Sequence, residues 1–250
     1  MSPESTLAHS WFITGTDTEI GKTLIASSLL HALGAIGVKA AGMKPIAAGA
    51  TERNGVLRND DADQLAQAAT VALSPALATP YLLRAAAAPH VAARLEQIEI
   101  DVRHVQQCFT RIVARAEAVV VEGVGGFRVP LSLGVDTADL AQQLGLPMIM
   151  VVGLRLGCIN HALLTAEAIA ARGLTLAGWV CNVVDPDMLH AQGSVDALIE
   201  RLPAPLLGAV PRLPVPDAAS AAQHIDFTLL PNWPRRKPPE ATARPAGPAA

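Results

Sequence analysis

The feature that most constrains how this chain can fold is a glycine-bounded loop between an apolar run and a helical stretch. The loop, Gly15-Thr16-Asp17-Thr18-Glu19-Ile20-Gly21-Lys22-Thr23, follows the β-prone residues 11–14 and opens a helical stretch over residues 22–35. A strand, a glycine-containing turn and a helix in this order are the context of a phosphate-binding loop. The strict pattern G-x-x-x-x-G-K-[ST] requires glycine at the place of Thr16, and here Gly15 stands one place earlier. We therefore predict a nucleotide-binding loop, with an ordinary tight strand–helix turn as the alternative.

The rest of the chain alternates short apolar runs with helical patterns. We expect strands at residues 38–43, 118–121, 147–152, 174–181 and 206–210, and helices at residues 101–115, 137–144, 159–172 and 188–201. Such alternation indicates βαβ units. Hydrophobic residues make up 51% of the chain and aromatic residues only 3%, so the core must consist of the aliphatic side chains typical of parallel sheets. The predicted fold class is α/β, a mainly parallel β-sheet of P-loop NTPase type flanked by helices on both faces.

The length of 250 residues suits one domain, which we place at residues 1–230. Residues 231–250 are rich in Pro, Ala and Arg and are predicted to form a disordered tail. A solvated extension is the favoured interpretation of this basic tail, and contact with an acidic partner is the alternative. Residues 47–59 show no periodicity and are expected to form a long loop after the second strand, at the edge of the sheet where ligands bind.

Charge and cysteine content narrow the classes of partner and compartment. The formal net charge is −3, so no strong field recruits nucleic acid or an anionic membrane. The three cysteines are widely spaced and in no metal-binding pattern, which indicates reduced, mostly buried thiols. Residues 1–9 lack the basic and apolar regions of a signal peptide, and prolines break the longest uncharged stretch, residues 64–83. We expect a cytoplasmic protein that binds neither nucleic acid nor membrane.

Two lysines are candidates for contact with phosphate. Lys22 lies in the predicted loop, and Lys44 ends the second predicted strand in Gly42-Met43-Lys44-Pro45. We expect Lys44 to follow an interior strand next to the phosphate loop, because ligands bind beyond the carboxyl ends of parallel strands. Two cations flanking one phosphate would stabilise the charge that develops during phosphoryl transfer. The alternative is that Lys44 is an ordinary surface lysine.

Carboxylates at strand ends are candidates for a metal site. Glu122 follows the apolar residues 118–121 and precedes Gly123-Val124-Gly125-Gly126, which is the arrangement of a Walker B acid that ligates Mg²⁺. Asp61 could be a further ligand, or Asp60 and Asp61 could simply form a helix N-cap. Glu19 is unusual inside a phosphate loop, because phosphate repels a carboxylate. Either its side chain points away from the phosphates, or the second substrate is cationic.

Taken together, these segments resemble the dethiobiotin synthetases, ATP-dependent enzymes of biotin synthesis, over about residues 11–230. The resemblance rests on the order of several motifs: the loop from Gly15 to Thr23, Lys44-Pro45, Leu57-Arg58-Asn59-Asp60-Asp61, Pro89-His90, Glu122-Gly123-Val124-Gly125-Gly126, Gly157-Cys158-Ile159-Asn160-His161 and Gly178-Trp179-Val180-Cys181-Asn182. It implies a cytoplasmic P-loop homodimer that uses ATP with Mg²⁺. The implied substrates are 7,8-diaminononanoate and CO₂, which are joined through a carbamate and a carbamic–phosphoric anhydride.

The resemblance also implies roles for individual residues. Lys44 and Lys22 would be catalytic, and Thr23, Asp61 and Glu122 would hold the metal. The implied nucleotide site consists of Thr18, Glu19, Ile20, Gly21, Lys22, Thr23, Leu24, Asp61, Glu122, Gly123, Val124, Gly125, Asn182, Pro211, Arg212, Leu213 and Asp217. The implied substrate site consists of Thr18, Lys44, Ala48, Gly157, Cys158 and Asn160, with the carboxylate of the substrate at the helix N-terminus that Gly157 opens.

Two positions leave questions open. Ala48 stands where the family typically has a serine that touches substrate, so we expect weaker substrate binding rather than loss of activity; a shifted substrate preference is the alternative. His90, on a loop that contains Pro89, could accept a proton from the substrate amine or be a structural histidine.

A nucleotide-dependent switch of the chromosome-partitioning type is the alternative function. Those ATPases carry an extra lysine early in the phosphate loop, where this chain has Gly15-Thr16-Asp17. Members that cycle on membranes also have a basic amphipathic C-terminal helix, whereas prolines break this tail. A glutaminase-containing relative would need a cysteine-based domain for which the chain has no room. The sequence therefore favours the synthetase.

Overall fold

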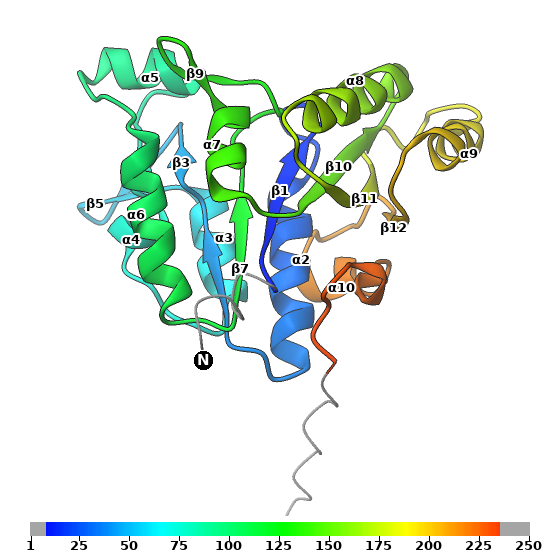
Figure 1. Cartoon of the computed structure of the whole chain (residues 1–250), viewed down its shortest axis with the longest axis horizontal. Helices are drawn as coiled ribbons and strands as arrows, with labels where there is room; N and C mark the ends of the chain where they lie inside the picture. The colour runs from blue at the N-terminus through cyan, green and yellow to red at the C-terminus, as the bar shows by residue number, and fades with distance from the viewer. Residues whose placement is uncertain (1–8, 236–250) are drawn as a thin grey trace, which may run out of the picture.

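The computed structural model describes residues 9–235, and these residues fold around one six-stranded parallel sheet (Figure 1). The strands lie in the order β12-β11-β10-β1-β7-β2. Their bounds are Trp11–Gly15 for β1, Ala40–Met43 for β2, Ala118–Glu122 for β7, Met148–Leu154 for β10, Leu176–Val183 for β11 and Leu206–Val210 for β12. All five pairings are parallel. Each predicted strand is therefore confirmed, and the predicted fold class with it.

Helices cover both faces of this sheet. The longer helices are α2 (Lys22–Ala35), α3 (Asp60–Ala68), α6 (Val102–Val113), α7 (Thr137–Leu144), α8 (Cys158–Ala171) and α9 (Ala191–Arg201); the shorter ones are α4 (Pro75–Ala78), α5 (Pro89–Leu95), α10 (Ala218–Ala222) and a 3₁₀ turn at Phe227–Leu229. Asp101 caps α6 as predicted, because its side chain accepts a hydrogen bond from Arg103 N–H. Parallel strands joined by such helices bury the sheet on both sides.

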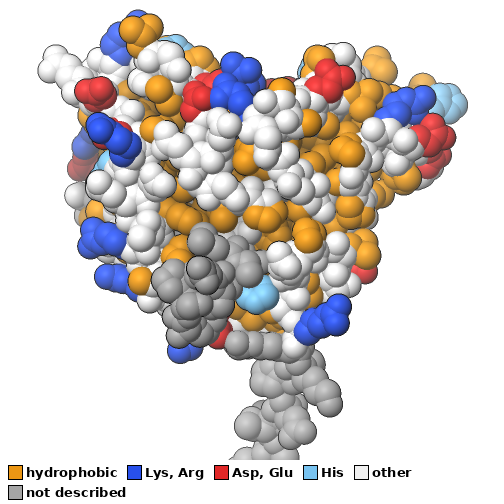
Figure 2. Space-filling model, viewed as in Figure 1, with side chains coloured by type: hydrophobic (Ala, Val, Ile, Leu, Met, Phe, Trp, Pro, Cys, Tyr) orange, Lys and Arg blue, Asp and Glu red, His pale blue; other side chains and the backbone are white. Residues whose placement is uncertain are grey.

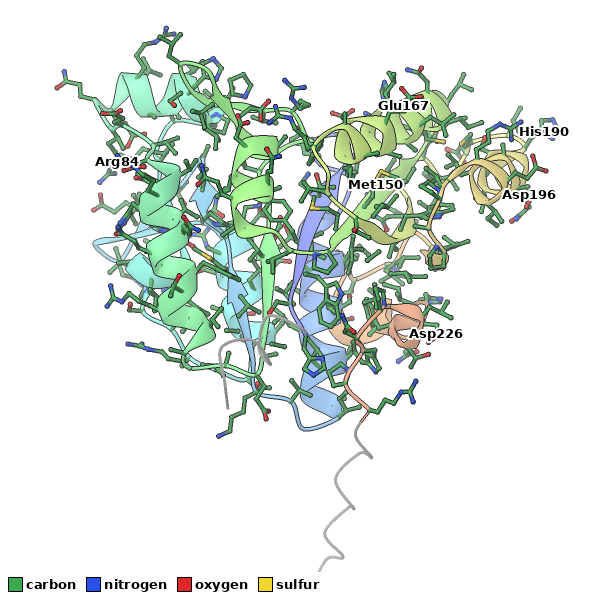
Figure 3. All side chains as sticks on the ribbon, in the orientation of Figure 1. Arg84, Met150, Glu167, His190, Asp196 and Asp226 are labelled. Atoms are coloured by element: carbon green, nitrogen blue, oxygen red, sulfur yellow. The ribbon has the colours of Figure 1, made fainter. Side chains whose placement is uncertain are left out.

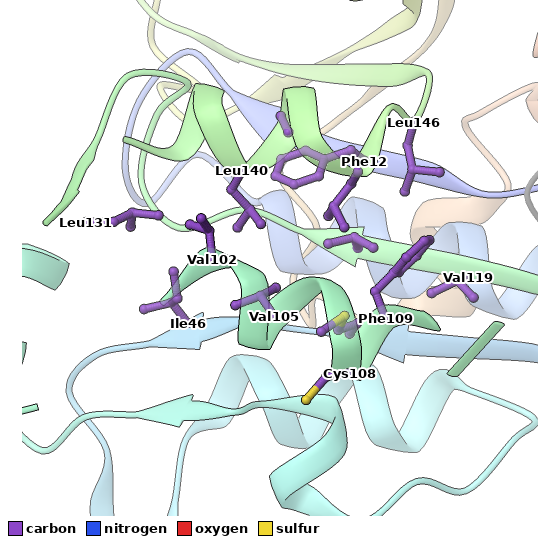
Figure 4. Packing of buried hydrophobic residues seen from close by; sticks show 14 of the residues in the cluster. Phe12, Ile46, Val102, Val105, Cys108, Phe109, Val119, Leu131, Leu140 and Leu146 are labelled. Atoms are coloured by element: carbon purple, nitrogen blue, oxygen red, sulfur yellow. The ribbon is translucent and has the colours of Figure 1, made fainter. Parts of the chain in front are cut away.

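The alternation of side chains along β1 separates the two apolar layers. Trp11 and Ile13 pack with α2 on one face, whereas Phe12 points to the opposite face and packs with α6 and α7. Figure 4 shows this second layer, in which Val105 and Phe109 of α6 gather with Phe12. Each of these three side chains of β1 is at most 1% exposed. The strand is therefore fixed on both sides, and the loop that follows it starts from a rigid base.

A third apolar cluster joins β10 and β11 to α8 and α9. Met150 of β10 lies inside it, fully buried, whereas Glu167 of α8 and His190 and Asp196 near α9 lie on the outer surface (Figure 3). Cys158 and Cys181 belong to the same cluster, and Cys108 lies in the layer beneath α6. All three cysteines are free and buried, as predicted. Within residues 9–235, no helix is long and apolar enough to cross a membrane.

The segment 47–59 is not the continuous loop that we predicted. Ile46–Ala47 forms β3, which pairs with β6 (Tyr81–Leu82), and an antiparallel hairpin follows from β4 (Thr51–Arg53) and β5 (Val56–Arg58). A further small pair consists of β8 (Pro130–Ser132) and β9 (Val135–Asp136). Asn54 and Gly55 at the hairpin turn have φ values of 53° and 76°. An Asn-Gly pair suits such a turn, because both residues tolerate positive φ.

Two other expectations need correction. Strand β2 is neither interior nor next to β1, because β7 lies between them and β2 forms an edge of the sheet. Neither Asp60 nor Asp61 caps α3, because the Asn59 side chain accepts the hydrogen bond from Ala62 N–H. Both aspartates lie instead in the first turn, where negative charge suits the helix dipole.

The predicted C-terminal tail is described only as far as residue 235, and residues 236–250 lie outside the described part. Within that tail, Trp233 packs against the body of the protein. Its ring stacks on Phe227 with centroids 5.9 Å apart and lies 6.2 Å from the ring of Trp11.

Candidate active site

A cavity of about 1250 Å³ lies at the carboxyl ends of the central strands. Segments that follow β1, β2, β7, β11 and β12 contribute to its wall, as expected for an open parallel sheet. Of the predicted site residues, the cavity brings together Thr18, Glu19, Gly21, Lys22, Thr23, Leu24, Lys44, Ala48, Asp61, Glu122, Val124, Gly125, Asn182, Pro211, Arg212 and Leu213. Residues from six separated parts of the chain therefore share one cavity.

The loop after β1 is held in place by a contact with β11. Gly21 has φ +90°, and a Cβ atom there would lie 2.3 Å from Nδ2 of Asn182. The same Nδ2 donates a hydrogen bond of 2.9 Å to the carbonyl of Ile20, whose side chain is buried in the core. Only glycine satisfies both the backbone conformation and this close approach. The first N–H groups of α2 consequently face the cavity and favour an anion there.

Lys22 is a buried cation at the start of α2. Its Nζ donates a hydrogen bond of 2.8 Å to the carbonyl of Asp17, and the residue is 7% exposed. Burial, together with the nearby charge of Lys44, lowers the pKa of Lys22 to about 8. The protein thus keeps a poorly compensated positive charge beside the helix terminus, and an anionic ligand would stabilise it.

Lys44 lies between two carboxylates. Its Nζ donates to Glu122 Oε1 at 2.5 Å and to Asp61 Oδ2 at 2.9 Å, with the carbonyl of Gly123 at 3.4 Å. Burial disfavours its charge, but Glu122 and Asp61 outweigh that effect and raise the pKa of Lys44. Lys44 is 3% exposed, so it is not the surface lysine of the alternative interpretation. Although β7 separates β1 from β2, both lysines reach the same cavity.

Glu122 ends β7 at the base of the cavity and is fully buried. Thr23 donates its hydroxyl to Oε1 at 2.8 Å, while Oε2 is buried without a hydrogen-bond partner. Burial raises the pKa of Glu122, and Lys44 counteracts this effect. An unpaired buried carboxylate oxygen is costly unless a cation or donor reaches it.

Thr23, Asp61 and Glu122 carry hydroxyl and carboxylate oxygens of the kind that Mg²⁺ binds, and Oε2 of Glu122 lacks a partner, so these residues fit a magnesium ion. Within the described residues, no group of three or more His, Cys, Asp or Glu side chains could hold a metal. The set of Thr23, Asp61 and Glu122 is consistent with that finding, because it contains only two such side chains. A magnesium ion here would need further oxygens from a ligand or water, which is how Mg²⁺ usually binds.

Several predicted site residues lie outside this arrangement or have other contacts. Gly157, Cys158 and Asn160 are at the N-terminus of α8 and do not line the cavity. Asp217 caps α10 and accepts hydrogen bonds from the backbone and hydroxyl of Ser220. Glu19 is exposed at the rim with φ 58°, which leaves both interpretations of its role open.

His90 lies in α5 rather than in a loop, and its Nδ1 is buried without a hydrogen-bond partner. The histidine does not line the large cavity. Ala48 does line it, and its carbonyl accepts a hydrogen bond of 3.2 Å from the Asn59 side chain. The structure thus places the site of the missing serine hydroxyl at the cavity wall.

Other residues of the site were not predicted from the sequence. Gln64 and the segment 86–88 line the cavity, and Arg155 after β10 forms an ion pair with Asp17 of the phosphate loop. The pattern Ala86-Ala87-Ala88 carries no chemical signal that could have revealed its position. The ion pair joins segments 138 residues apart, so only the strand order brings its partners together.

Comparison of this sequence with known proteins identifies its family. A family model described as AAA domain matches residues 9–220. The ATP-dependent dethiobiotin synthetase BioD of Janthinobacterium sp. (strain Marseille) is 62% identical over 234 residues, which cover 92% of this chain and 99% of that protein. The chain belongs to the dethiobiotin synthetase family. The resemblance that the motifs predicted is therefore confirmed.

Solved structures of other proteins share the fold of this member of the dethiobiotin synthetase family. The MinC:MinD cell division complex of Aquifex aeolicus matches with a TM-score of 0.55 at 15% identity, over 88% of this chain and 93% of that one. The septum site-determining protein MinD of Pyrococcus horikoshii OT3, complexed with Mg-ADP, matches with a TM-score of 0.54 at 16% identity, over 88% of each chain. At such identities the likeness shows the P-loop NTPase fold alone.

Proposed function

We propose that this protein is an ATP-dependent cyclo-ligase that makes dethiobiotin from 7,8-diaminononanoate and CO₂, with release of ADP and phosphate. One observation carries the proposal: Lys22 at the start of α2 and Lys44 after β2 reach one cavity in a chain 62% identical to an ATP-dependent dethiobiotin synthetase. The cavity of about 1250 Å³ exceeds the roughly 300–1,000 Å³ of a typical ligand pocket, so it has room for a nucleotide and a second substrate.

The reaction requires three bond-forming steps in this cavity. One amine nitrogen bonds to the carbon of CO₂ and loses a proton, which gives a carbamate. A carbamate oxygen then attacks the γ-phosphorus of ATP, and ADP leaves. The second amine attacks the carbonyl carbon of this anhydride, so that the ring closes and phosphate leaves. Carbamates are weak nucleophiles, so the protein must align them and exclude water.

The protein supplies positive charge where these reaction steps develop negative charge. The N-terminus of α2 and Lys22 face the region in which the β- and γ-phosphates would bind. Lys44 would stabilise the carbamate oxygen and the transferred phosphoryl group. Its ion pairs with Asp61 and Glu122 keep it protonated for this role. A Mg²⁺ ion held by Thr23, Asp61 and Glu122 would supply further charge beside the phosphates.

The opposite end of the cavity would hold the base of the nucleotide. Asn182 uses Nδ2 to hold the carbonyl of Ile20, so its Oδ1 can accept a hydrogen bond from an adenine amino group. Pro211, Arg212 and Leu213 line the cavity after β12 and would enclose the base. Support for this assignment comes from the shared cavity and from the family.

A homodimer would complete the substrate site. Gly157 and Asn160 lie outside the cavity of their own chain, at the N-terminus of α8, where a carboxylate is favoured. Leu156 and Leu164 on this segment are 91% and 56% exposed. Figure 2 shows apolar side chains gathered across the middle of the face that includes α7, β10 and α8. An apolar face of this kind suits a partner subunit, whose α8 would then approach the substrate.

The deciding experiment measures phosphate release by the purified protein with MgATP and CO₂, with and without 7,8-diaminononanoate, while mass spectrometry follows the product. We expect phosphate and dethiobiotin to appear together, and only with the diamine. Lys44→Ala should abolish both signals, while the control Lys39→Ala, at an exposed position, should not. Phosphate release that ignores the diamine would refute the synthetase and favour a switch ATPase.

A further inference from the structure

The phosphate loop forms an ion pair with the segment that follows β10. Nη2 of Arg155 contacts Oδ2 of Asp17. Neither of these residues lines the large cavity. Their side chains are 45% and 39% exposed, and an ion pair as exposed as this one contributes little to the stability of a fold. The effect of Arg155 therefore depends on what the carboxylate of Asp17 holds in turn.

Asp17 fixes the orientation of one peptide group of the loop. Thr18 N–H donates a hydrogen bond of 2.8 Å to Oδ1 of Asp17, and the Asp17 carbonyl accepts one of 2.8 Å from Lys22 Nζ. Both backbone groups belong to the planar peptide unit between residues 17 and 18, in which C=O and N–H point in opposite directions. Because the carboxylate holds the N–H on one side, the carbonyl faces Lys22 on the other. Rotation of this peptide group would turn the carbonyl away from Lys22.

The carbonyl of Asp17 anchors the ammonium group of Lys22. Among the described residues it is the one hydrogen-bond partner of Lys22 Nζ, and Lys22 is only 7% exposed, so water offers little replacement. An ammonium group has three N–H donors, so two remain for phosphate oxygens. Catalysis of phosphoryl transfer consists almost entirely of positioning and charge stabilisation. The anchor of Lys22 therefore bears directly on the reaction.

Arg155 reaches the loop from a well-fixed backbone. It follows β10, which pairs directly with β1, and Thr16 N–H donates a hydrogen bond of 3.0 Å to the carbonyl of Val151 in β10. The carbonyl of Arg155 accepts a hydrogen bond of 3.0 Å from Cys158 N–H at the start of α8. The ion pair thus ties the loop after β1 to the segment between β10 and α8.

We propose that Arg155 is a positioning residue for phosphoryl transfer, which acts through Asp17 and the peptide group between residues 17 and 18 to hold Lys22 toward the phosphates of ATP. This inference rests on the proposed function, because it concerns how Lys22 assists that reaction. Arg155 lies outside the cavity that would hold the nucleotide, so it acts without contact with ATP. Its effect must consequently disappear when the carboxylate of Asp17 is removed.

A double-mutant cycle tests this dependence. Arg155→Met is made both in the wild-type protein and in Asp17→Ala, which lacks the carboxylate. Arg201→Met is the matched control: Arg201 of α9 is similarly exposed, at 51%, and pairs with Glu200, and neither of these two residues lines the large cavity. Titration calorimetry without the diamine gives the Kd for ATP. Initial rates of dethiobiotin formation give kcat/KM for ATP and the KM for the diamine.

We expect Arg155→Met to raise the Kd for ATP and to lower kcat/KM for ATP by about three- to fivefold, the upper part of the range for an exposed ion pair. In the Asp17→Ala background the same substitution should change either quantity by less than about 1.5-fold, because residues that act as a unit are not additive. Arg155→Lys keeps the charge and should stay within about twofold of wild type. The KM for the diamine should not change in any of these variants.

Three results would overturn the inference. An equal loss in both backgrounds would mean that Arg155 acts without Asp17. A rise in the KM for the diamine alone would mean that Arg155 acts on the substrate rather than on ATP. Values for Arg155→Met equal to those of Arg201→Met would mean that the ion pair positions nothing.

The calorimetric measurement separates this inference from the proposed function. A wild-type protein that binds ATP but forms no dethiobiotin would refute the synthetase function. The Kd values for ATP across the same cycle would still show whether Arg155 acts through Asp17.

Discussion

Replacing Lys22 with methionine should stabilise the free protein at neutral pH even though it removes a residue of the active site. Lys22 is buried, and its pKa is lowered from 10.5 to about 8. Each pKa unit is worth about 1.4 kcal/mol, so the protonated lysine costs about 3 kcal/mol of folding free energy. Methionine has a similar length and carries no charge. The variant loses one hydrogen bond to the carbonyl of Asp17, which is worth about 1 kcal/mol.

The net gain expected for Lys22→Met at pH 7 is about 2 kcal/mol. For a chain of this size, this corresponds to a rise in Tm of roughly 4–8 °C. Urea unfolding followed by circular dichroism gives the free energy, and a thermal scan gives Tm. Lys39→Met is the matched control, because Lys39 is exposed and its replacement should change stability by less than about 0.5 kcal/mol.

The pH dependence provides the sharper test of this reasoning. Because the pKa of Lys22 is lower in the folded state, the unfolded state binds more protons between about pH 8 and 10.5, and wild-type stability rises with pH over that window. The penalty is complete below pH 8 and is relieved above it. Between pH 7 and 9.5, wild type should gain about 2 kcal/mol relative to Lys22→Met, so the difference between them nearly vanishes.

Two results would refute the argument for Lys22. The first is a variant less stable than wild type at pH 7, since this would mean that the buried charge is better compensated than the structure indicates. The second is a stability difference that stays constant up to pH 9.5. In either case the same variant should still bind ATP poorly, because its phosphates lose the cation that faces them.

Three further changes have defined outcomes. Lys44→Met should lower kcat for dethiobiotin formation by about 10²–10³-fold, measured by product mass, while ATP affinity by calorimetry changes much less. Ala48→Ser should lower the KM for the diamine by about fivefold at constant kcat, because one added hydrogen bond is worth about 1 kcal/mol. An unchanged KM would show that the cavity wall at Ala48 does not contact the substrate. Gly21→Ala should destabilise the fold by about 1–3 kcal/mol and weaken ATP binding, because the φ of Gly21 is +90° and a Cβ atom would collide with Asn182. A variant with the Tm and the ATP affinity of wild type would contradict this expectation.

Most elements that depend on residues close in the sequence were predicted correctly. The apolar run that ends in Glu122 forms a buried strand, and Lys22 opens a helix directly after the glycine turn. Each of these elements depends on neighbours within a few residues. The hairpin at residues 51–58 was missed although its signal is local, because Asn54-Gly55 is a strong turn pair that we interpreted as part of a loop.

The arrangement of the candidate site was only partly predictable, because it depends on strand order. The sequence placed Lys44 at the carboxyl end of a strand but did not reveal that β7 lies between this strand and β1. The position of β7 determines the electrostatics of the site. Glu122 ends this strand, which lies between β1 and β2, the strands that precede the two lysines. The ion pairs of Lys44 with Glu122 and Asp61 span 78 and 17 residues and follow from that order.

The order of the strands also explains why two lysines in one cavity have opposite pKa shifts. Lys44, from the edge strand, lies directly against Glu122 of the intervening strand and against Asp61, so the pKa of Lys44 is raised. Lys22, across β7, is paired with a backbone carbonyl, and burial lowers its pKa to about 8. A ligand with several negative charges is therefore stabilised chiefly at Lys22, where charge is uncompensated. Lys44 remains protonated with or without that ligand, as a residue that assists transfer of a phosphoryl group must.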